Sequence, residues 1–149
     1  MKKYLTITML IAAVSALSSH AFAQTTSTRL EALLQPVIAV DASGRARLDN
    51  EGGVVNDRFT AEVEIAKDDF AALGITPANG FGDEVVILQV LRNGTLVYRL
   101  RLPFYRNLTN DIIFEADIRG TAAPELQAGD VARVVVNGHF TLRGRFQVR

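Results

Sequence analysis

Apolar and polar side chains alternate along most of the chain after residue 28, and turn-forming residues interrupt this alternation at short intervals. A period of two places successive side chains on opposite faces of a strand, so the pattern is typical of strands that bury one face. Glycine, asparagine and aspartate gather in the interruptions, as tight turns require. The sequence therefore predicts an all-β chain of short antiparallel strands.

The clearest hairpin is expected over residues 84–104, EVVILQVLRNGTLVYRLRLPF. Asn93 and Gly94 lie between two apolar runs and tolerate the positive φ angles that a two-residue turn requires. One face of this hairpin would be the core face, and whether the chain or a partner covers the apolar stripe on the other face stays open. The core-facing pairs would be Leu91 with Leu96, Gln89 with Tyr98, Ile87 with Leu100 and Val85 with Leu102, and the opposite face would carry Val86, Leu88, Val90, Val97, Arg99 and Arg101.

A second hairpin is expected around Asn137 and Gly138, which join residues 131–136 to residues 139–148. A simple two-residue turn would place Arg133 on one face with apolar side chains only. A three-residue loop with Gly138 in a left-handed bulge avoids this grouping. The first register groups Arg133 with Val131, Val135, Phe140 and Leu142, whereas the second, which we favour, aligns Ala132, Val134 and Val136 with Phe140 and Leu142.

Three further strands follow from the same alternation. Residues 58–66 and 111–119 bury alternate apolar side chains and turn their carboxylates to solvent, as half-buried strands do. Residues 44–49 are a shorter strand, and the D-N-E-G-G stretch after it suits a hairpin into the 58–66 strand.

Two segments have ambiguous or helical patterns. Residues 28–35 are left open between a strand and a short helix, because Thr28 and Glu31 form a capping-box pattern while apolar residues also alternate. Residues 68–73 are the best helix candidate, at most two turns long, between an aspartate cap and Gly74. The expected fold is a single antiparallel β-sandwich of seven or eight strands, of the Ig-like or Greek-key type, with one short helix in a connector.

The first 23 residues have the form of a secretory signal peptide. Lys2 and Lys3 begin it, residues 5–17 are an apolar run, and the A-F-A at 21–23 offers a cleavage site. The apolar run is shorter than the roughly 20 residues that a membrane-spanning helix needs. Cleavage after Ala23 would leave 126 of the 149 residues. We therefore expect a periplasmic or extracellular protein that is not an integral membrane protein, with a disordered tether at 24–28 and the β domain at 29–149.

The composition argues against several kinds of chemistry. The chain has no cysteine, so it has no disulfide, no thiol nucleophile and no cysteine-ligated metal. Basic and acidic side chains balance at 16 each, and with export this disfavours nucleic acid as a partner. His139 is the only histidine after the leader, and it lies beside a hairpin tip without a local catalytic partner. No cofactor motif is present, and turn formation explains the oxygen-rich residues at 49–57, so no cofactor or metal is expected.

Arginine supplies the candidate binding surface. The chain after the leader has 13 arginines and a single lysine, Lys67. Four arginines gather with three aromatic side chains around the 84–104 hairpin, and arginine with tyrosine is a combination that protein interfaces favour. We expect this hairpin, or an edge strand, to contact an unknown protein or glycan of the bacterial envelope, and self-association is left open. The candidate residues are Arg92, Tyr98, Arg99, Arg101, Phe104, Tyr105 and Arg106.

Two alternatives belong to other functional classes. Glycoside hydrolysis needs only two carboxylates at a set separation, so a small carbohydrate-active enzyme is the first alternative. Its carboxylates would lie two residues apart on a strand, about 7 Å, but salt bridges on a solvated strand explain the same pattern. The second alternative, an eight-stranded outer-membrane barrel, is disfavoured by the supply of only eight Phe and three Tyr. The outward carboxylates are Glu62, Glu64, Glu115 and Asp117.

The last third of the chain, PELQAGDVARVVVNGHFTLRGRF, resembles the ending of small exported bacterial all-β domains. Those domains follow an A-G-D-x-V, then N-G, then L-x-G-x-F pattern, and the earlier SGRARLD, RFTAEVEI and NGTLV segments fit the same family. The resemblance spans most of residues 29–148 and rests on turn and core positions. It implies a shared sandwich-like fold and no known activity. The longer connector KDDFAALGITPANGFGDE departs from the pattern and leaves the shape of that segment open.

Overall fold

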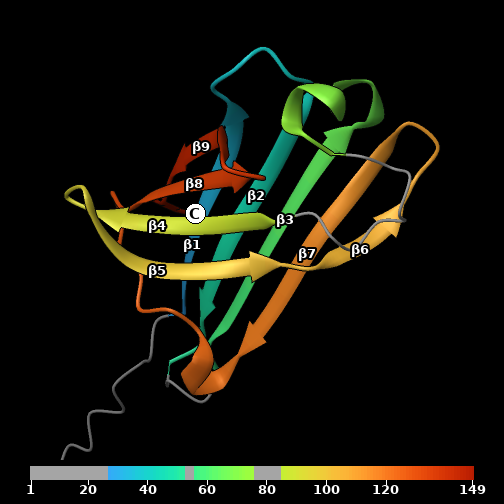
Figure 1. Cartoon of the computed structure of the whole chain (residues 1–149). Helices are drawn as coiled ribbons and strands as arrows, with labels where there is room; N and C mark the ends of the chain where they lie inside the picture. The colour runs from blue at the N-terminus through green and yellow to red at the C-terminus, as the bar shows by residue number, and fades with distance from the viewer. Residues whose placement is uncertain (1–26, 53–55, 76–84) are drawn as a thin grey trace, which may run out of the picture.

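The protein folds into one curled antiparallel sheet of ten strands, shaped like half a barrel. The structure is a computed structural model that describes residues 27–52, 56–75 and 85–149. The strand order is β5-β4-β8-β9-β1-β2-β3-β7-β6, and β10 pairs with β1. The layer of β5, β4, β8 and β9 crosses in front of the layer of β1, β2, β3 and β7 (Figure 1). The strands are β1 (Thr28–Pro36), β2 (Ala42–Asn50), β3 (Arg58–Ala66), β4 (Val86–Arg92), β5 (Thr95–Leu102), β6 (Phe104–Asn107), β7 (Asp111–Arg119), β8 (Val131–Val136), β9 (His139–Arg145) and β10 (Gln147–Val148).

The predicted all-β, antiparallel class is confirmed, but the sheet has ten strands instead of seven or eight and is continuous instead of split in two. The reason is that β1 belongs to both layers. Most of β1 pairs with β2, while its last residues, Gln35 and Pro36, pair with β9. The open question over residues 28–35 is thereby answered, since this segment is a strand. Its first residue, Thr28, already pairs with Asn50, and the expected leader lies outside the described residues.

Two glycines allow the sheet to curl at β1. A Cβ atom on Gly144 of β9 would lie 2.3 Å from the carbonyl oxygen of Leu33, and one on Gly44 of β2 would lie 2.7 Å from that of Glu62. Neither backbone oxygen can move aside without breaking the local pairing. The absence of a side chain at these two positions is therefore a requirement of the corner.

Pro103 forms the opposite corner. It alone separates β5 from β6, the two edge strands of the sheet, so the chain passes directly from one layer to the other. Proline has no N–H to donate to a ladder, which suits a point where a strand changes its partner. Its carbonyl accepts a hydrogen bond of 3.1 Å from the Glu115 N–H of β7.

The first predicted hairpin is present, and Tyr98, Leu100 and Leu102 of β5 face the core as predicted, but the inward and outward faces of β4 are reversed. Asn93 and Gly94 form the two-residue turn with φ angles of 50° and 84°, as expected. One residue of β5, Val97, then bulges out of the ladder, so Leu91 pairs with Leu96 while Val90 pairs with Tyr98. An extra residue on one strand exchanges the faces beyond it. The chain itself buries the stripe expected to face outward, Val86, Leu88 and Val90, whereas Val85, Ile87, Gln89 and Leu91 face away from the core.

The second hairpin uses the same device. Asn137 and Gly138 have φ angles of 46° and 89°, so the predicted three-residue loop is wrong and the turn has two residues. The register shifts at Thr141, two pairs beyond the turn, as it does at Val97 in the first hairpin. The predicted core positions Ala132, Val134, Val136 and Leu142 are buried, but Phe140 is 41% exposed on the outer face.

The remaining elements follow the sequence closely. Strands β3 and β7 have the predicted bounds, and β2 pairs with β3 as the expected hairpin, although residues 53–55 near its tip lie outside the described chain. Instead of one short helix, the connector has two 3-10 turns, η2 (Lys67–Asp69) and η3 (Ala71–Leu73), which end at Gly74 with φ 65°. A third, η5 (Gly120–Ala122), follows β7. No helix in the described ranges is long and apolar enough to cross a membrane.

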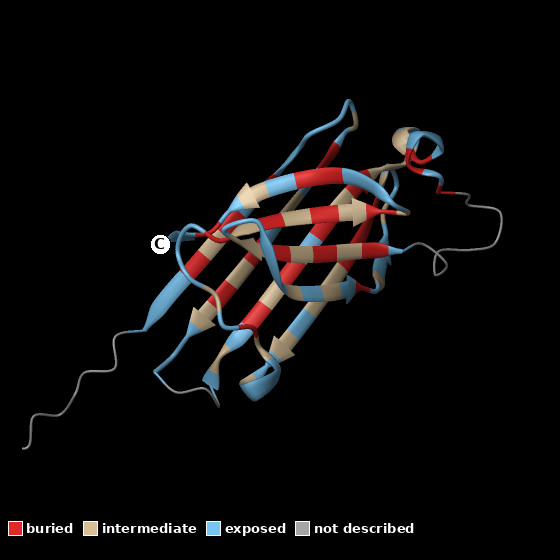
Figure 2. Ribbon diagram, turned by 60° about the vertical axis from the view of Figure 1, so that its left-hand side comes forward, coloured by how far each residue is buried: buried red, intermediate tan, exposed pale blue. Residues whose placement is uncertain are grey.

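The core lies between the two layers. Buried and exposed residues alternate along the strands (Figure 2), which is the pattern from which the strands were predicted. The ring of Tyr98 on β5 meets that of Phe59 on β3 edge-on, with 5.7 Å between centroids. The largest fully buried side chains come from both layers and include Phe59, Phe114, Phe146, Leu34, Ile65, Leu88 and Leu142.

Candidate binding surface

Two of the seven predicted binding residues serve the fold instead. Arg92 holds the buried Asp130 with two hydrogen bonds, from Nε at 2.9 Å and from Nη2 at 2.8 Å. This guanidinium, helped by the backbone N–H of Gln127 at 3.0 Å, holds the pKa of the Asp130 carboxyl below its usual value. Tyr98 points into the core, and its burial raises the pKa of its hydroxyl. These contacts remove Arg92 and Tyr98 from the candidate surface.

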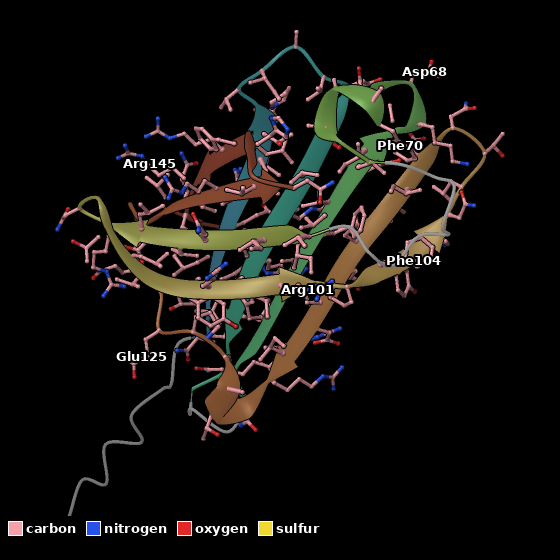
Figure 3. All side chains as sticks on the ribbon, viewed as in Figure 1. Asp68, Phe70, Arg101, Phe104, Glu125 and Arg145 are labelled. Atoms are coloured by element: carbon pink, nitrogen blue, oxygen red, sulfur yellow. The ribbon has the colours of Figure 1, made fainter. Side chains whose placement is uncertain are left out.

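The other five predicted residues lie at the surface but in two groups. Phe104 packs edge-on against Phe114 at the Pro103 corner, with 6.4 Å between ring centroids. Tyr105 is exposed, and the Arg106 guanidinium lies 5.4 Å from its ring centroid. Arg99 and Arg101 are exposed on the outer face of β5, which Pro103 separates from β6. Figure 3 shows Arg101 and Phe104 on either side of this corner. The structure therefore does not bring the seven residues together as one site.

Arg99 and Arg101 belong to a larger cationic surface, which we call the arginine face. It is the outer surface of β5, β4, β8 and β9, the side turned away from the core. Every arginine on it follows or precedes a side chain that packs into the core, so the alternation of each strand fixes its outward direction. The arginine face carries no Asp or Glu, and its arginines are Arg99 and Arg101 on β5, Arg133 on β8, and Arg143 and Arg145 on β9.

The pairing register lines up three of these arginines in a row across the strands. Arg99 lies opposite Gln89, Gln89 opposite Arg133, and Arg133 opposite Arg143. Arg133 donates from Nε to the Gln89 side chain at 2.6 Å, and its guanidinium lies 5.9 Å from the ring centroid of Phe140. Two like charges directly opposite each other on neighbouring strands are unfavourable. The Arg133–Arg143 pair is therefore a local cost to the fold unless an anion lies between the two groups.

Apolar side chains flank this cationic row on both sides. One flank is formed by Leu96, Leu91 and Val131, and the other by Ile87, Val135 and Phe140, which are also neighbours in the register. A shallow hollow of about 270 Å³ lies among them, and both apolar side chains and arginines line it. Such a surface suits a partner that offers negative charge beside apolar groups. The hollow is lined by Leu91, Gly94, Val131, Arg133, Phe140 and Arg143.

On the opposite side of the molecule the arginines of β1, β2, β3 and β7 are paired with carboxylates, although Glu62 and Glu115 face each other without an ion pair among the described residues. On the outer face of β1, β2, β3 and β7, Asp49 pairs with two arginines and Asp117 with two more. Glu31 likewise pairs with Arg45 and Arg149. By contrast, none of the five arginines of the arginine face forms an ion pair with any residue in the described parts of the chain. Five of the six arginines without an ion pair in the described chain thus lie on one layer, and the sixth is Arg106 on β6.

Of the four candidate catalytic carboxylates, Asp117 is the one that the structure pairs with arginines. Glu62 and Glu115 lie directly opposite each other, a neighbour relation that the sequence did not reveal, and they border an open hollow of about 250 Å³. Arg58 binds Asp117 through two hydrogen bonds, of 3.0 and 2.9 Å. Together with a hydrogen bond from Arg119, this lowers the pKa of Asp117 to about 2. Asp117 is therefore committed as an ionised partner of arginine and is unsuited to donating a proton.

The sequence does not predict three arginines of this face, Arg133, Arg143 and Arg145, or Phe140 as binding residues. The rejected hairpin register grouped Arg133 with Val131, Val135 and Phe140, and the structure places these four together on the outer face. In the described ranges, no three acidic or histidine side chains cluster in a way that could hold a metal ion. The chain matches no protein-family model, no curated protein and no solved structure.

Proposed function

We propose that the protein is an exported, non-catalytic binding module that contacts an anionic protein or glycan of the envelope through the arginine face. The carrying observation is that five arginines lie on one side of the sheet without an ion pair in the described chain, while those of the other layer are paired. The central like-charge pair, Arg133 and Arg143, has a cost that an anionic partner would remove. The proposed partner would thereby supply the negative charge that these arginines lack within the described chain.

The chemistry of the face supports this proposal. Guanidinium groups are weakly hydrated and bind carboxylate, sulfate or phosphate through two parallel hydrogen bonds. The apolar rows beside them contribute contact area that a purely charged surface lacks. Because the face is built on paired strands, its backbone is held in place before binding, which lowers the entropy that binding costs.

The test is titration of the protein with two probes, polyglutamate and a uronate oligosaccharide, at low and high salt. A triple variant, R99S/R101S/R143S, removes three charges from the arginine face. Its matched control, R29S/R45S/R119S, removes three charges from the opposite layer. We expect the first variant to weaken binding of at least one probe by tenfold or more, since exposed charge pairs contribute up to about 1 kcal/mol each. Equal effects of the two variants, or no binding of either probe, would refute the proposal.

A further inference from the structure

We infer that the partner is an extended acidic segment of a protein, which adds to the free edge of β5 as a further strand. This inference rests on the proposed function of the arginine face, because it concerns the same arginines. It goes further by naming the class of partner and the strand that receives it.

The first observation is that β5 ends the sheet. It pairs with β4 on one side only, and no other part of the described chain pairs with it over residues 95–101. Its backbone N–H and C=O groups on the far side are therefore available to another strand. Extended peptides commonly bind proteins by adding to such an edge, because each backbone hydrogen bond contributes regardless of the peptide's sequence.

The second observation is that this edge strand is packed against the core. The inward side chains Tyr98, Leu100 and Leu102 pack into the core, and Leu102 is fully buried. An incoming peptide thus meets a strand whose geometry is already set. The bulge at Val97 and the proline at 103 interrupt the edge, which confines regular pairing to the five residues between them.

The third observation is the charge on that five-residue stretch. Its two outward side chains are Arg99 and Arg101, both exposed and without an ion pair in the described chain. No Asp or Glu occurs anywhere in residues 93–110. An added strand lies about 4.8 Å from β5, with side chains on one face about 7 Å apart. Two acidic side chains at alternate positions of the peptide would each face one of these arginines.

The same arginines have another interpretation, in which they only protect the edge from pairing with other copies of the chain. Charged side chains on an edge strand often serve this purpose. The two interpretations differ in the expected effect of removing the charges. Protection predicts that the variant self-associates and that acidic peptides never bind, whereas a binding edge predicts loss of peptide affinity.

The experiment uses an eight-residue peptide with glutamate at alternate positions and threonine between them. Two N-methylated versions block the backbone, one at the glutamates and the other at the threonines. Because neighbouring residues of a strand turn their N–H groups to opposite edges, only one of the two versions should lose binding, by about tenfold or more. R99S/R101S should weaken the unmodified peptide by about tenfold, and the charge-matched R45S/R119S by less than about twofold.

The outcomes separate this inference from the proposed function. If the peptide binds but both N-methylated versions bind as well as the parent, the backbone edge is not used and the inference is overturned, while the arginine face still stands as a binding surface. The same holds if only the uronate oligosaccharide binds. If R99S/R101S self-associates and the wild-type protein binds no acidic peptide, the arginines protect the edge and the inference fails.

Discussion

Deletion of Val97 should leave the fold and the arginine face intact, although it removes a residue from the middle of a strand. Val97 is the bulged residue, and the pairs on either side of it, Leu91 with Leu96 and Val90 with Tyr98, are already in step. Removing it joins two stretches of regular ladder without moving any other side chain to the opposite face.

The size of the effect follows from the burial of Val97, which is 43% exposed. Full burial of a valine contributes about 1.5 kcal/mol or more, so losing a side chain that is about half buried should cost about 1 kcal/mol of unfolding free energy. Deletion of Leu100 is the matched contrast on the same strand. It turns either Arg99 or Arg101 into the core, depending on where the register adjusts, and an unpaired buried charge costs several kcal/mol. That loss approaches the whole stability of a typical domain.

Urea unfolding followed by circular dichroism measures both variants. The Val97 deletion should unfold cooperatively, about 1 kcal/mol below wild type, and should still bind the acidic probe of the arginine face. The Leu100 deletion should be unfolded or recovered only as aggregate. Equal damage from the two deletions would refute the assignment of Val97 as the bulge and with it the outward direction of Arg99 and Arg101.

Three further predictions concern stability. Gly144→Ala should lower the free energy of unfolding by more than about 3 kcal/mol, because its Cβ would lie 2.3 Å from the Leu33 carbonyl oxygen. Gly94→Ala, in open space with positive φ, should lower it by only about 1 kcal/mol. Thermal melts that show similar losses for the two variants would contradict the corner at β1. Asp130→Asn should lower the free energy of unfolding, measured in urea, by about 2 kcal/mol, because it removes the buried carboxylate that Arg92 binds. Asp117→Asn, at an exposed position, should lower it by less than about 1 kcal/mol. The reverse order would contradict the buried pair. The pKa of Asp117 is about 2 in the fold against an ordinary 3.8, so its stabilisation is complete above pH 4 and is lost as the pH falls from 4 through 2. Stability measured over that range should fall less steeply in Asp117→Asn than in wild type, and identical slopes would speak against the Arg58–Asp117 pair.

The sequence predicts those parts of the fold in which each residue's local pattern decides its place. In β3 apolar side chains alternate without interruption, in β7 they alternate except at Ile113, and both strands have the bounds that the alternation indicates. The two Asn-Gly turns are equally local, since positive φ at Asn93 and Asn137 is a property of the turn itself. No long-range contact is needed to recognise either feature.

The local pattern does not predict which face of β4, or of the hairpin around Asn137, is buried. On β4 both faces are apolar, with Val86 and Leu88 on one and Ile87 and Leu91 on the other, so the pattern alone does not say which is buried. The bulge at Val97 decides it, and a bulge depends on packing against the other layer. The continuity of the sheet through β1 is likewise a tertiary feature, although Gly44 and Gly144 mark its position in the sequence.

Local pattern likewise predicts only a part of the arginine face, because the rest depends on strand pairing. Arg99 and Arg101 are neighbours in the sequence, whereas Arg133 and Arg143 join them only through the pairing of β4 with β8 and of β8 with β9. The register that groups Arg133 with valines and Phe140 is unfavourable for a core face. It is acceptable for an outer face, which is where the structure places these residues. In and directly after β9, Arg143 and Arg145 alternate with Leu142, Gly144 and Phe146, so the sequence already places these two arginines on an outer face. Arginine beside apolar side chains on an outer face is a pattern that indicates a binding surface.

The most direct measurement of the arginine face as the contact surface is an NMR titration of the labelled protein with the alternating glutamate peptide. The amide shifts that change should belong to β5 and the adjoining outer positions of β4, β8 and β9, with the Arg99 and Arg101 signals among the largest. The signals of β2, β3 and β7 should stay unchanged. Shifts centred on the Arg45 and Arg58 side of the sheet, or spread evenly over both layers, would show that the unpaired arginines are not the binding surface.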